Sequence, residues 1–262
     1  MTTTIALAGK GGTGKTTIAA MVIKYLTQTR SGAILAIDAD PSSNLNMVLG
    51  LELEWTVGEI REDMLEQVKR SLTAGGAAMG ALSGGMSKRD YLDYEIRSSI
   101  AEGARFDLIA MGRSEGPGCY CAVNHNLREV IDSISRNYRY VVIDNEAGME
   151  HLSRRTTRNV EKLLIVSDPT QRGLTAAARI AGFRHELDIQ IEEAYLILNG
   201  LVDDDIPAPL QATIDTLDIP LLGVVPRDDE LIAFEFSGRP LIELGDDSPV
   251  YKAVAAMMDS IL

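Results

Sequence analysis

The 262-residue chain has few cysteines and no long apolar run, and each absence excludes a class of protein. Only two cysteines occur, which argues against a disulfide-stabilised secreted fold and favours a reducing compartment. No apolar stretch approaches the roughly 20 residues that span a bilayer. The first residues lead directly into a strand pattern, so we expect no signal peptide and a cytoplasmic protein.

Basic residues are also scarce, because 25 Lys and Arg face 38 Asp and Glu and leave a net charge of −13. Binding to nucleic acid depends on neutralising phosphates, so this balance argues against a protein that coats DNA. The helical pattern over 248–262 has one lysine and no basic face, which makes it a poor membrane anchor. We therefore expect partners that are neither nucleic acid nor membrane.

Short apolar runs alternate with helical patterns along the chain, which favours a parallel sheet buried on both faces. The predicted strands are Thr3–Ala8, Ala33–Ile37, Phe106–Met111, Tyr140–Ile143, Leu163–Val166, Tyr195–Leu198 and Leu221–Val225. Helices are expected at 16–29, 57–72, 90–101, 124–136, 173–186, 228–236 and 248–262. The prediction is an α/β protein with one doubly wound, mostly parallel sheet of seven or eight strands and helices on both faces.

No interdomain linker or repeat is visible, so we expect a single domain over residues 1–262. An insertion near 71–90 stands apart, because its centre, Ala74–Gly85 (AGGAAMGALSGG), lacks periodicity and is rich in glycine and alanine. A mobile surface loop is one interpretation of this segment. A lid or docking segment that orders with nucleotide is the other.

A phosphate-binding loop occupies residues 9–16, where GKGGTGKT matches G-x-x-x-x-G-K-[ST]. Glycines let backbone N–H groups close around phosphates, and the helix that follows points its positive end at them. Lys15 is expected to reach the β- and γ-phosphates, and the Thr16 hydroxyl to ligate Mg²⁺. The alternative is a glycine-rich hairpin. The residues expected to bind ATP or ADP here are Gly9, Lys10, Gly11, Gly12, Thr13, Gly14, Lys15, Thr16 and Thr17.

The second lysine of this loop, Lys10, lies on its outer lip. From there its ammonium can point across a subunit boundary more easily than at its own phosphates. The pattern resembles the deviant-Walker ATPases, which include nitrogenase iron protein, the MinD and ParA ATPases and metallocentre-assembly ATPases. In that family two protomers enclose two ATP molecules, so the resemblance implies a homodimer in which Lys10 acts on the partner's nucleotide. A solvated loop lysine is the alternative.

Acidic residues follow two of the predicted strands, at the edge where ligands of such sheets bind. Asp40 is expected to orient the water that attacks the γ-phosphate, as in the switch I segment of the resembled family, and Asp38 to support Lys15 or the metal shell. Asp144 has the position of a Walker B acid that holds Mg²⁺. Gly148 is placed as a switch II hinge. Helix or turn capping is the alternative for Asp38 and Asp40.

Two late strands end in polar residues that the resemblance assigns to adenine. Asn199 would pair with the adenine edge through its amide, or would be an ordinary turn asparagine. The backbone around Pro226, Arg227 and Asp228 would hold the ring. Together with Lys10, Lys15 and Asp40, these residues complete the expected ATPase site.

Cys119 and Cys121 are the two cysteines of the chain, and both follow a turn-rich stretch after a predicted strand. A bond between thiols at i and i+2 on extended backbone would be strained, whereas in a turn both can face a metal. One C-x-C supplies two ligands and a closed thiolate site wants four, so a two-fold dimer would complete it. Free buried cysteines are the alternative. His125 could add a ligand, although an ordinary helix histidine is favoured.

The segments 112–121 (GRSEGPGCYC) and 144–155 (DNEAGMEHLSRR) resemble the nickel-insertion ATPases of carbon monoxide dehydrogenase and acetyl-CoA synthase, of the CooC and AcsF type. The resemblance covers nearly the whole chain. It implies a dimer that hydrolyses ATP, binds one Ni²⁺ or Zn²⁺ through Cys119 and Cys121, and has an apo form of either enzyme as its partner. Thiolates suit both metals, so the residues do not distinguish them.

Two other functions remain open at this point. A spatial-positioning ATPase of the MinD or ParA kind would bind membrane or DNA, which the acidic charge opposes. An iron–sulfur carrier ATPase would resemble nitrogenase iron protein, whose cluster uses two well-separated cysteines per subunit, and this chain has no second position.

Overall fold

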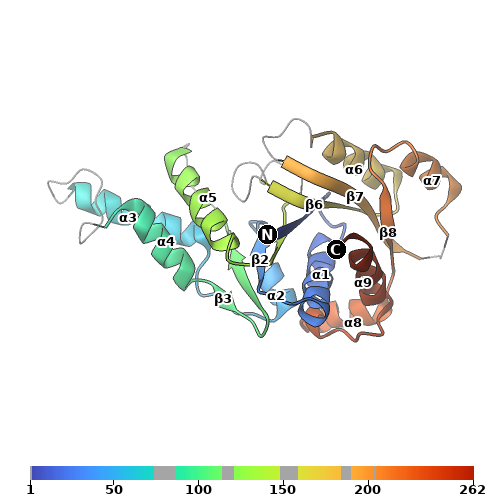
Figure 1. Ribbon diagram of the computed structural model, residues 1–262, viewed down its shortest axis with the longest axis horizontal. Coiled ribbons are helices and arrows are strands. Elements are labelled where there is room, and N and C mark those ends of the chain that lie inside the picture. The colour runs from blue at the N-terminus through green and yellow to red at the C-terminus, as the bar shows by residue number, and fades with distance from the viewer. Residues whose placement is uncertain (1, 74–85, 114–120, 148–158, 184–189, 203–204) are drawn as a thin grey trace.

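A single eight-stranded sheet runs through the computed structural model, which describes residues 2–73, 86–113, 121–147, 159–183, 190–202 and 205–262 (Figure 1). Its order is β3-β4-β2-β5-β1-β6-β7-β8, and every neighbouring pair is parallel except β3 with β4. The prediction of a doubly wound, mostly parallel α/β sheet is confirmed. The strands are β1 (Thr3–Gly9), β2 (Ile34–Asp38), β3 (Ala101–Glu102), β4 (Phe106–Ala110), β5 (Tyr140–Asp144), β6 (Asn159–Ser167), β7 (Gln190–Leu201) and β8 (Leu221–Pro226).

Helices cover both faces of the sheet, and alternation along each strand divides the core in two. In β1, Ile5 and Leu7 belong to one buried cluster, whereas Ala6 and Ala8 belong to the other. The Ile5 face is covered by α1 (Lys15–Thr29), α2 (Leu45–Leu49), α8 (Asp229–Ser237), η2 (Leu241–Glu243) and α9 (Pro249–Ile261). The Ala6 face is covered by α3 (Val57–Thr73), α4 (Lys88–Ser98), α5 (Cys121–Ser135), α6 (Gln171–Phe183) and α7 (Ala208–Ile214).

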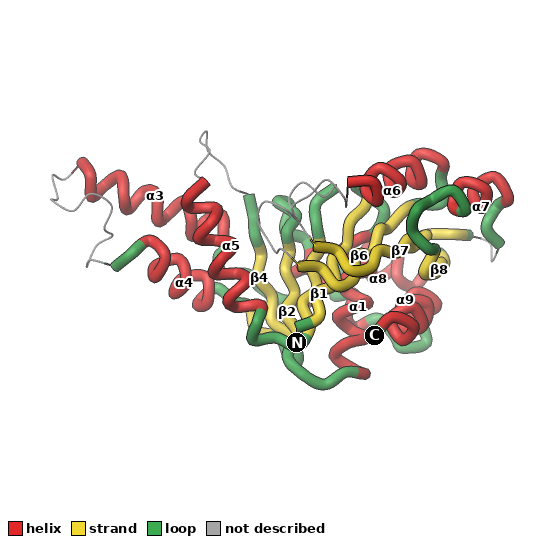
Figure 2. Tube along the Cα trace, turned by 45° about the horizontal axis from the view of Figure 1, so that its top comes forward, coloured by secondary structure: helices red, strands yellow, loops and turns green. Residues whose placement is uncertain are grey.

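The helices on the Ala6 face form two groups. Figure 2 shows α3, α4 and α5 together beside β4, and α6 and α7 beside β7 and β8. An ion pair between Arg89 of α4 and Glu129 of α5, at 3.3 Å, links two members of the first group. Among the described residues, no helix is both long enough and apolar enough to cross a membrane.

Four short elements were not predicted, and the shortest helix among them is the three-residue η2. Strand β3 has two residues, pairs antiparallel with β4 and occupies the end of the stretch expected to be helical over 90–101, because α4 ends at Ser98. Helices α2 and α7 have five and seven residues, which is too short for a helical period to show. The centre of the predicted 71–90 insertion, residues 74–85, lies outside the described residues.

Candidate functional site

The phosphate-binding loop joins the end of β1 to the start of α1, at the centre of the sheet. Gly12 and Gly14 have φ values of +80° and +88°, a region that glycine enters without strain. A Cβ atom on Gly9 would lie 2.3 Å from the carbonyl oxygen of Val166, and one on Gly14 would lie 2.2 Å from Nδ2 of Asn199. These glycines therefore allow β6 and β7 to approach the loop closely.

The two lysines of the loop have different surroundings. Lys15 is buried, with 7% of its surface exposed, and its Nζ donates to the carbonyl oxygen of Lys10 at 3.3 Å. Burial lowers the pKa of Lys15, and the carboxylates of Asp144, Asp40 and Glu146 act in the opposite direction. Lys10 is exposed on the outer side of the loop. This placement suits the predicted roles, which remain predictions.

Asp144 and Thr16 meet beneath the loop, where the Thr16 hydroxyl donates to Oδ2 of Asp144 at 2.6 Å. Burial raises the pKa of Asp144 to about 6, while the Thr16 hydrogen bond and the charge of Lys15 lower it. Its other oxygen, Oδ1, is buried and has no hydrogen-bond partner among the described residues. An unsatisfied buried carboxylate oxygen beside a hydroxyl is a set of oxygen ligands that Mg²⁺ prefers. These two residues therefore fit the predicted magnesium site.

Asp38 is fully buried at the end of β2. Its carboxylate accepts hydrogen bonds from backbone N–H groups. Its Oδ1 accepts the N–H of Asp40 at 3.1 Å, and its Oδ2 accepts the N–H of Leu45 at 2.9 Å. The loop that carries Asp40 is thus held at both ends by one carboxylate. Burial raises the pKa of Asp38 to about 7, and the two hydrogen bonds lower it. These bonds match the capping alternative for Asp38.

Asp40 is half-buried, and its side chain also takes part in the turn. Its Oδ1 accepts the N–H of Ser42 at 2.8 Å, and its carbonyl oxygen accepts the N–H of Ser43 at 3.0 Å. Ser43 has a φ of +46°, which is uncommon for a residue with a side chain. The carboxylate contributes to the charge around Lys15. Its predicted water-positioning role is compatible with this place and stays a prediction.

The residues expected near adenine lie at the ends of β7 and β8. Nδ2 of Asn199 donates to the carbonyl oxygen of Thr13 at 2.8 Å and so ties β7 to the phosphate-binding loop. Asp228 caps α8 by accepting the N–H of Glu230 at 2.9 Å, and it also accepts the Ser248 hydroxyl at 2.7 Å. Its carboxylate is therefore structural, which leaves the backbone of this turn for the predicted adenine contact. Arg227 is exposed beside it.

Two predicted residues lie outside the described part of the chain. They are Cys119 and Gly148. Cys121 is the first residue of α5, so the C-x-C motif stands at the start of the helix that packs on α4. Within the described ranges, no group of three or more His, Cys, Asp or Glu side chains could hold a metal ion.

Sequence reasoning missed two features around the loop. Asn145 follows Asp144, is buried, and donates from Nδ2 to the carbonyl oxygen of Leu7 at 2.7 Å, which joins the ends of β5 and β1. A hollow of about 430 Å³ lies beside Lys10 and is lined by the turn between β6 and α6. The run of polar residues after β6, beginning with Asp168, was the available signal for the second feature.

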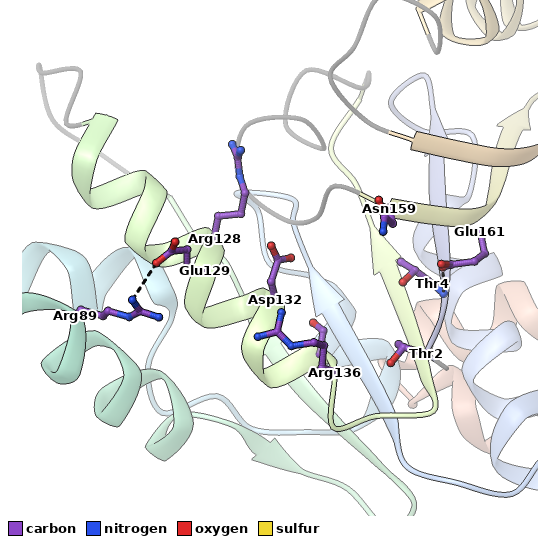
Figure 3. A pocket seen from close by; sticks show the side chains of 10 residues that line it. Thr2, Thr4, Arg89, Arg128, Glu129, Asp132, Arg136, Asn159 and Glu161 are labelled. Atoms are coloured by element: carbon purple, nitrogen blue, oxygen red, sulfur yellow. Dashed lines mark hydrogen bonds and ion pairs between the residues drawn. The ribbon is translucent and has the colours of Figure 1, made fainter.

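A larger cavity, of about 620 Å³, lies away from the phosphate-binding loop (Figure 3). It is bounded by α5 and by the amino ends of β1 and β6, whereas the loop follows the carboxyl end of β1. Thr4 and Glu161 are joined there, because the N–H of Thr4 donates to Oε2 of Glu161 at 2.7 Å. The size of a cavity therefore does not identify the nucleotide site in this protein. A phosphate-binding loop surrounds its ligand with backbone N–H groups on an open surface and needs no deep cavity.

Comparison with known proteins agrees with this geometry. The family model described as "CobQ/CobB/MinD/ParA nucleotide binding domain" matches residues 4–241. An uncharacterised ATP-binding protein of Methanocaldococcus jannaschii is 40% identical over 258 residues, which is 98% of each chain. The carbon monoxide dehydrogenase accessory protein CooC of Rhodospirillum rubrum is 30% identical over 263 residues, 98% of this chain and 95% of that one.

Solved structures show the same fold. The septum site-determining protein MinD of Pyrococcus horikoshii, complexed with Mg-ADP, superposes with a TM-score of 0.67 at 23% identity, over 100% of this chain and 96% of that one. The MinD cell-division ATPase of Pyrococcus furiosus gives 0.68 at 23% identity, over 100% and 98%. Sequence, fold and loop geometry together show that the chain belongs to the CobQ/CobB/MinD/ParA family of P-loop nucleotide-binding ATPases.

Proposed function

We propose that this ATPase is a metallochaperone that dimerises with ATP, binds one Ni²⁺ or Zn²⁺ through Cys119 and Cys121, and supports nickel insertion into carbon monoxide dehydrogenase or acetyl-CoA synthase. The observation that carries the proposal is the C-x-C motif at the start of α5, in a chain 30% identical to CooC along 98% of its length. The printed name of that relative makes it an accessory protein of carbon monoxide dehydrogenase.

The nucleotide half of the proposal uses residues whose positions are described above. Lys15 and the loop backbone hold the phosphates, Asp40 orients the attacking water, and Asn199 with the 226–228 backbone holds adenine. Thr16 and Asp144 would hold Mg²⁺, which supplies positive charge to the β- and γ-phosphates. Lys10 contributes from the second copy. Positioning and charge neutralisation carry the rate, because hydrolysis here needs no covalent intermediate.

The metal half depends on two copies of the chain. Each copy supplies two thiolates, and a closed thiolate site for Zn²⁺ has four. An isologous dimer brings the same pair together across its axis. Cys121 is the first residue of α5, which contacts α4, and α4 in turn contacts α3. A metal ion bound by Cys121 would therefore be attached directly to this group of helices. A dimer therefore gives one metal ion a link to both protomers.

Metal analysis of the wild-type protein and of a Cys119→Ala/Cys121→Ala variant tests this function. We expect one divalent ion per two chains for the wild type, and loss of the ion in the variant while ATP hydrolysis persists. His125→Ala is the matched control and should keep the ion. Unchanged metal content in the double variant, with ATPase activity intact, would overturn the assignment of the metal site.

The same preparations test the two competing functions. ATP-dependent retention on DNA or on anionic vesicles would support a spatial-positioning ATPase and contradict the metallochaperone. A visible absorption band after anaerobic purification would favour an iron–sulfur carrier. We expect neither, because the net charge is −13 and the chain contains a single C-x-C pair.

A further inference from the structure

Lys10 shares its surroundings with one other cation, Arg172. Both side chains line the hollow of about 430 Å³ at the outer side of the phosphate-binding loop. The remaining lining residues are Asp168 and Thr170, from the turn between β6 and α6, and Gln171, the first residue of α6. The loop and this turn are neighbours because Gly9 pairs with Val166 in the sheet.

The turn between β6 and α6, which directly precedes the helix that carries Arg172, is fixed by its own hydrogen bonds. The Thr170 hydroxyl donates to Oδ1 of Asp168 and accepts the N–H of Gly173 at 3.0 Å. A Cβ atom on Gly173 would lie 2.1 Å from the same Asp168 oxygen, so the turn is closed tightly against the helix. Gln171 is anchored to α7, because its Nε2 donates to the carbonyl oxygen of Pro209 at 3.0 Å. The backbone that carries the Arg172 side chain is therefore held in place on both sides.

The two cations of this hollow outnumber its one carboxylate, that of Asp168, so an excess of positive charge remains. Neither Lys10 nor Arg172 forms a side-chain hydrogen bond or ion pair with any residue of the described ranges. Asp168 accepts from Thr170, as described above. Both cations are exposed on a protein whose net charge is −13. Two unpaired cations side by side in such a protein indicate an anionic ligand that arrives from outside.

The chain's own nucleotide does not account for this pair, because Lys15 is the buried lysine of the loop, whereas Lys10 is exposed. We propose that Arg172 acts together with Lys10 on the triphosphate bound by a second copy of the chain. This inference rests on the ATP-dependent dimer of the proposed function and adds a catalytic residue to its composite site.

ATP hydrolysis develops negative charge that a guanidinium group can stabilise. During hydrolysis the bond between the γ-phosphorus and the β–γ bridging oxygen breaks, a water oxygen bonds to the phosphorus, and the water proton passes to the phosphate product. Negative charge grows on the bridging oxygen of the departing ADP. A guanidinium supplied by a neighbouring molecule can stabilise that charge, and removal of one such donor commonly lowers kcat by about 100-fold or more. Because Lys10 remains, we expect Arg172→Ala to lower kcat by about 10-fold to 100-fold.

Mixtures of inactive variants distinguish action on the partner's nucleotide from action on the chain's own. Arg172→Ala mixed with Asp40→Ala should regain activity, because in the heterodimer the Arg172→Ala copy keeps Asp40 and receives both cations from its partner. With random exchange, half of the dimers are mixed and each has one complete site, so recovery should approach about one quarter of wild type. Arg172→Ala mixed with Lys10→Ala should gain nothing.

The outcomes separate the inference from the function on which it rests. If Arg172 acted on its own nucleotide, the recovery would appear in the Lys10→Ala mixture and not in the Asp40→Ala mixture, which would overturn the proposal. Wild-type activity in Arg172→Ala alone would also overturn it. Recovery in a Lys10→Ala and Asp40→Ala mixture confirms the dimer independently, and its failure would remove the composite site altogether. Arg179→Ala, seven residues further along the exposed side of α6, is the matched control and should keep wild-type kcat.

Discussion

At the residue scale, the buried carboxylate of Asp38 has two backbone partners in the loop that carries Asp40. Each of its oxygens accepts one N–H, so the carboxylate ties the two ends of this loop together. The charges that act on Lys15 come from Asp144, Asp40 and Glu146. Asp38 is therefore a positioning residue, because its hydrogen bonds fix the backbone of the loop that carries Asp40.

An Asp38→Asn substitution should weaken this loop, because an amide has one acceptor oxygen and would place its NH₂ group against a backbone N–H. A buried donor without a partner costs about 1–3 kcal/mol, so we expect a loss of that size in the free energy of unfolding. The kcat for ATP should fall while nucleotide affinity changes little. Chemical denaturation and steady-state kinetics measure both. Asp205→Asn, at an exposed loop position, is the control and should alter neither.

The pKa values of Asp38 and Asp144 also predict how stability depends on pH. Both are raised by burial, to about 7 and about 6, so between about pH 4 and pH 7 the folded protein binds more protons than the unfolded chain. Stability from these groups is present at low pH and is lost as the pH rises through their folded pKa values. The nucleotide-free wild type should therefore show a steeper fall in stability from pH 5 to pH 8 than Asp38→Asn. Equal slopes would contradict the raised pKa of Asp38.

At the element scale, three segments meet where β4 leads toward the C-x-C motif. The N–H of Met111 donates to the carbonyl oxygen of Asp38 at 2.7 Å, and the N–H of Gly58 donates to the carbonyl oxygen of Met111 at 2.9 Å. Gly112 has a φ of +61°, and a Cβ atom there would lie 2.4 Å from Oγ1 of Thr56. The end of β4 is thus held between the end of β2 and the start of α3.

A Gly112→Ala substitution should disrupt this junction, because its φ disfavours a side chain and the added carbon meets Thr56. We expect a loss of about 1–3 kcal/mol in the free energy of unfolding, and weaker metal binding through displacement of the chain that leads to Cys119. Denaturation and metal titration measure the two effects. Gly182→Ala on α6 is the matched control: its Cβ meets nothing within 4 Å, so the protein should be unchanged or slightly more stable. Equal stability of the two variants would contradict the account.

The central strands were predictable from sequence because each is buried on both faces and reads as a continuous apolar run, as in Tyr140–Asp144. The elements that were missed lack such a signal. Strand β3 is two residues long and exists because an antiparallel partner is available at the edge of β4. Helix α2 has five residues, and Asp38 fixes its start through the N–H of Leu45. Such elements are set by tertiary contacts, which periodicity does not record.

At the scale of the whole molecule, the strand order brings the predicted nucleotide residues to one edge of the sheet. Asp38 and Asp144 are partners in the β2–β5 register, and Leu7, just before the phosphate-binding loop, is the partner of Asp144 in β1–β5. Topology therefore explains why residues more than 100 positions apart could be assigned to one site from sequence alone. The uses of individual side chains were not predictable, because the cap formed by Asp228 and the place of Arg172 depend on the paths of loops.

The proposed function requires that nucleotide-driven association of two copies closes a single metal site. Native mass spectrometry of the protein with Zn²⁺ and a non-hydrolysable ATP analogue tests it most directly, since it reports chain number and metal number in the same particle. We expect a dimer that carries one zinc ion besides its nucleotides, and a Cys119→Ala/Cys121→Ala dimer that carries none. One zinc ion on each monomer, or a wild-type dimer that binds two, would contradict it.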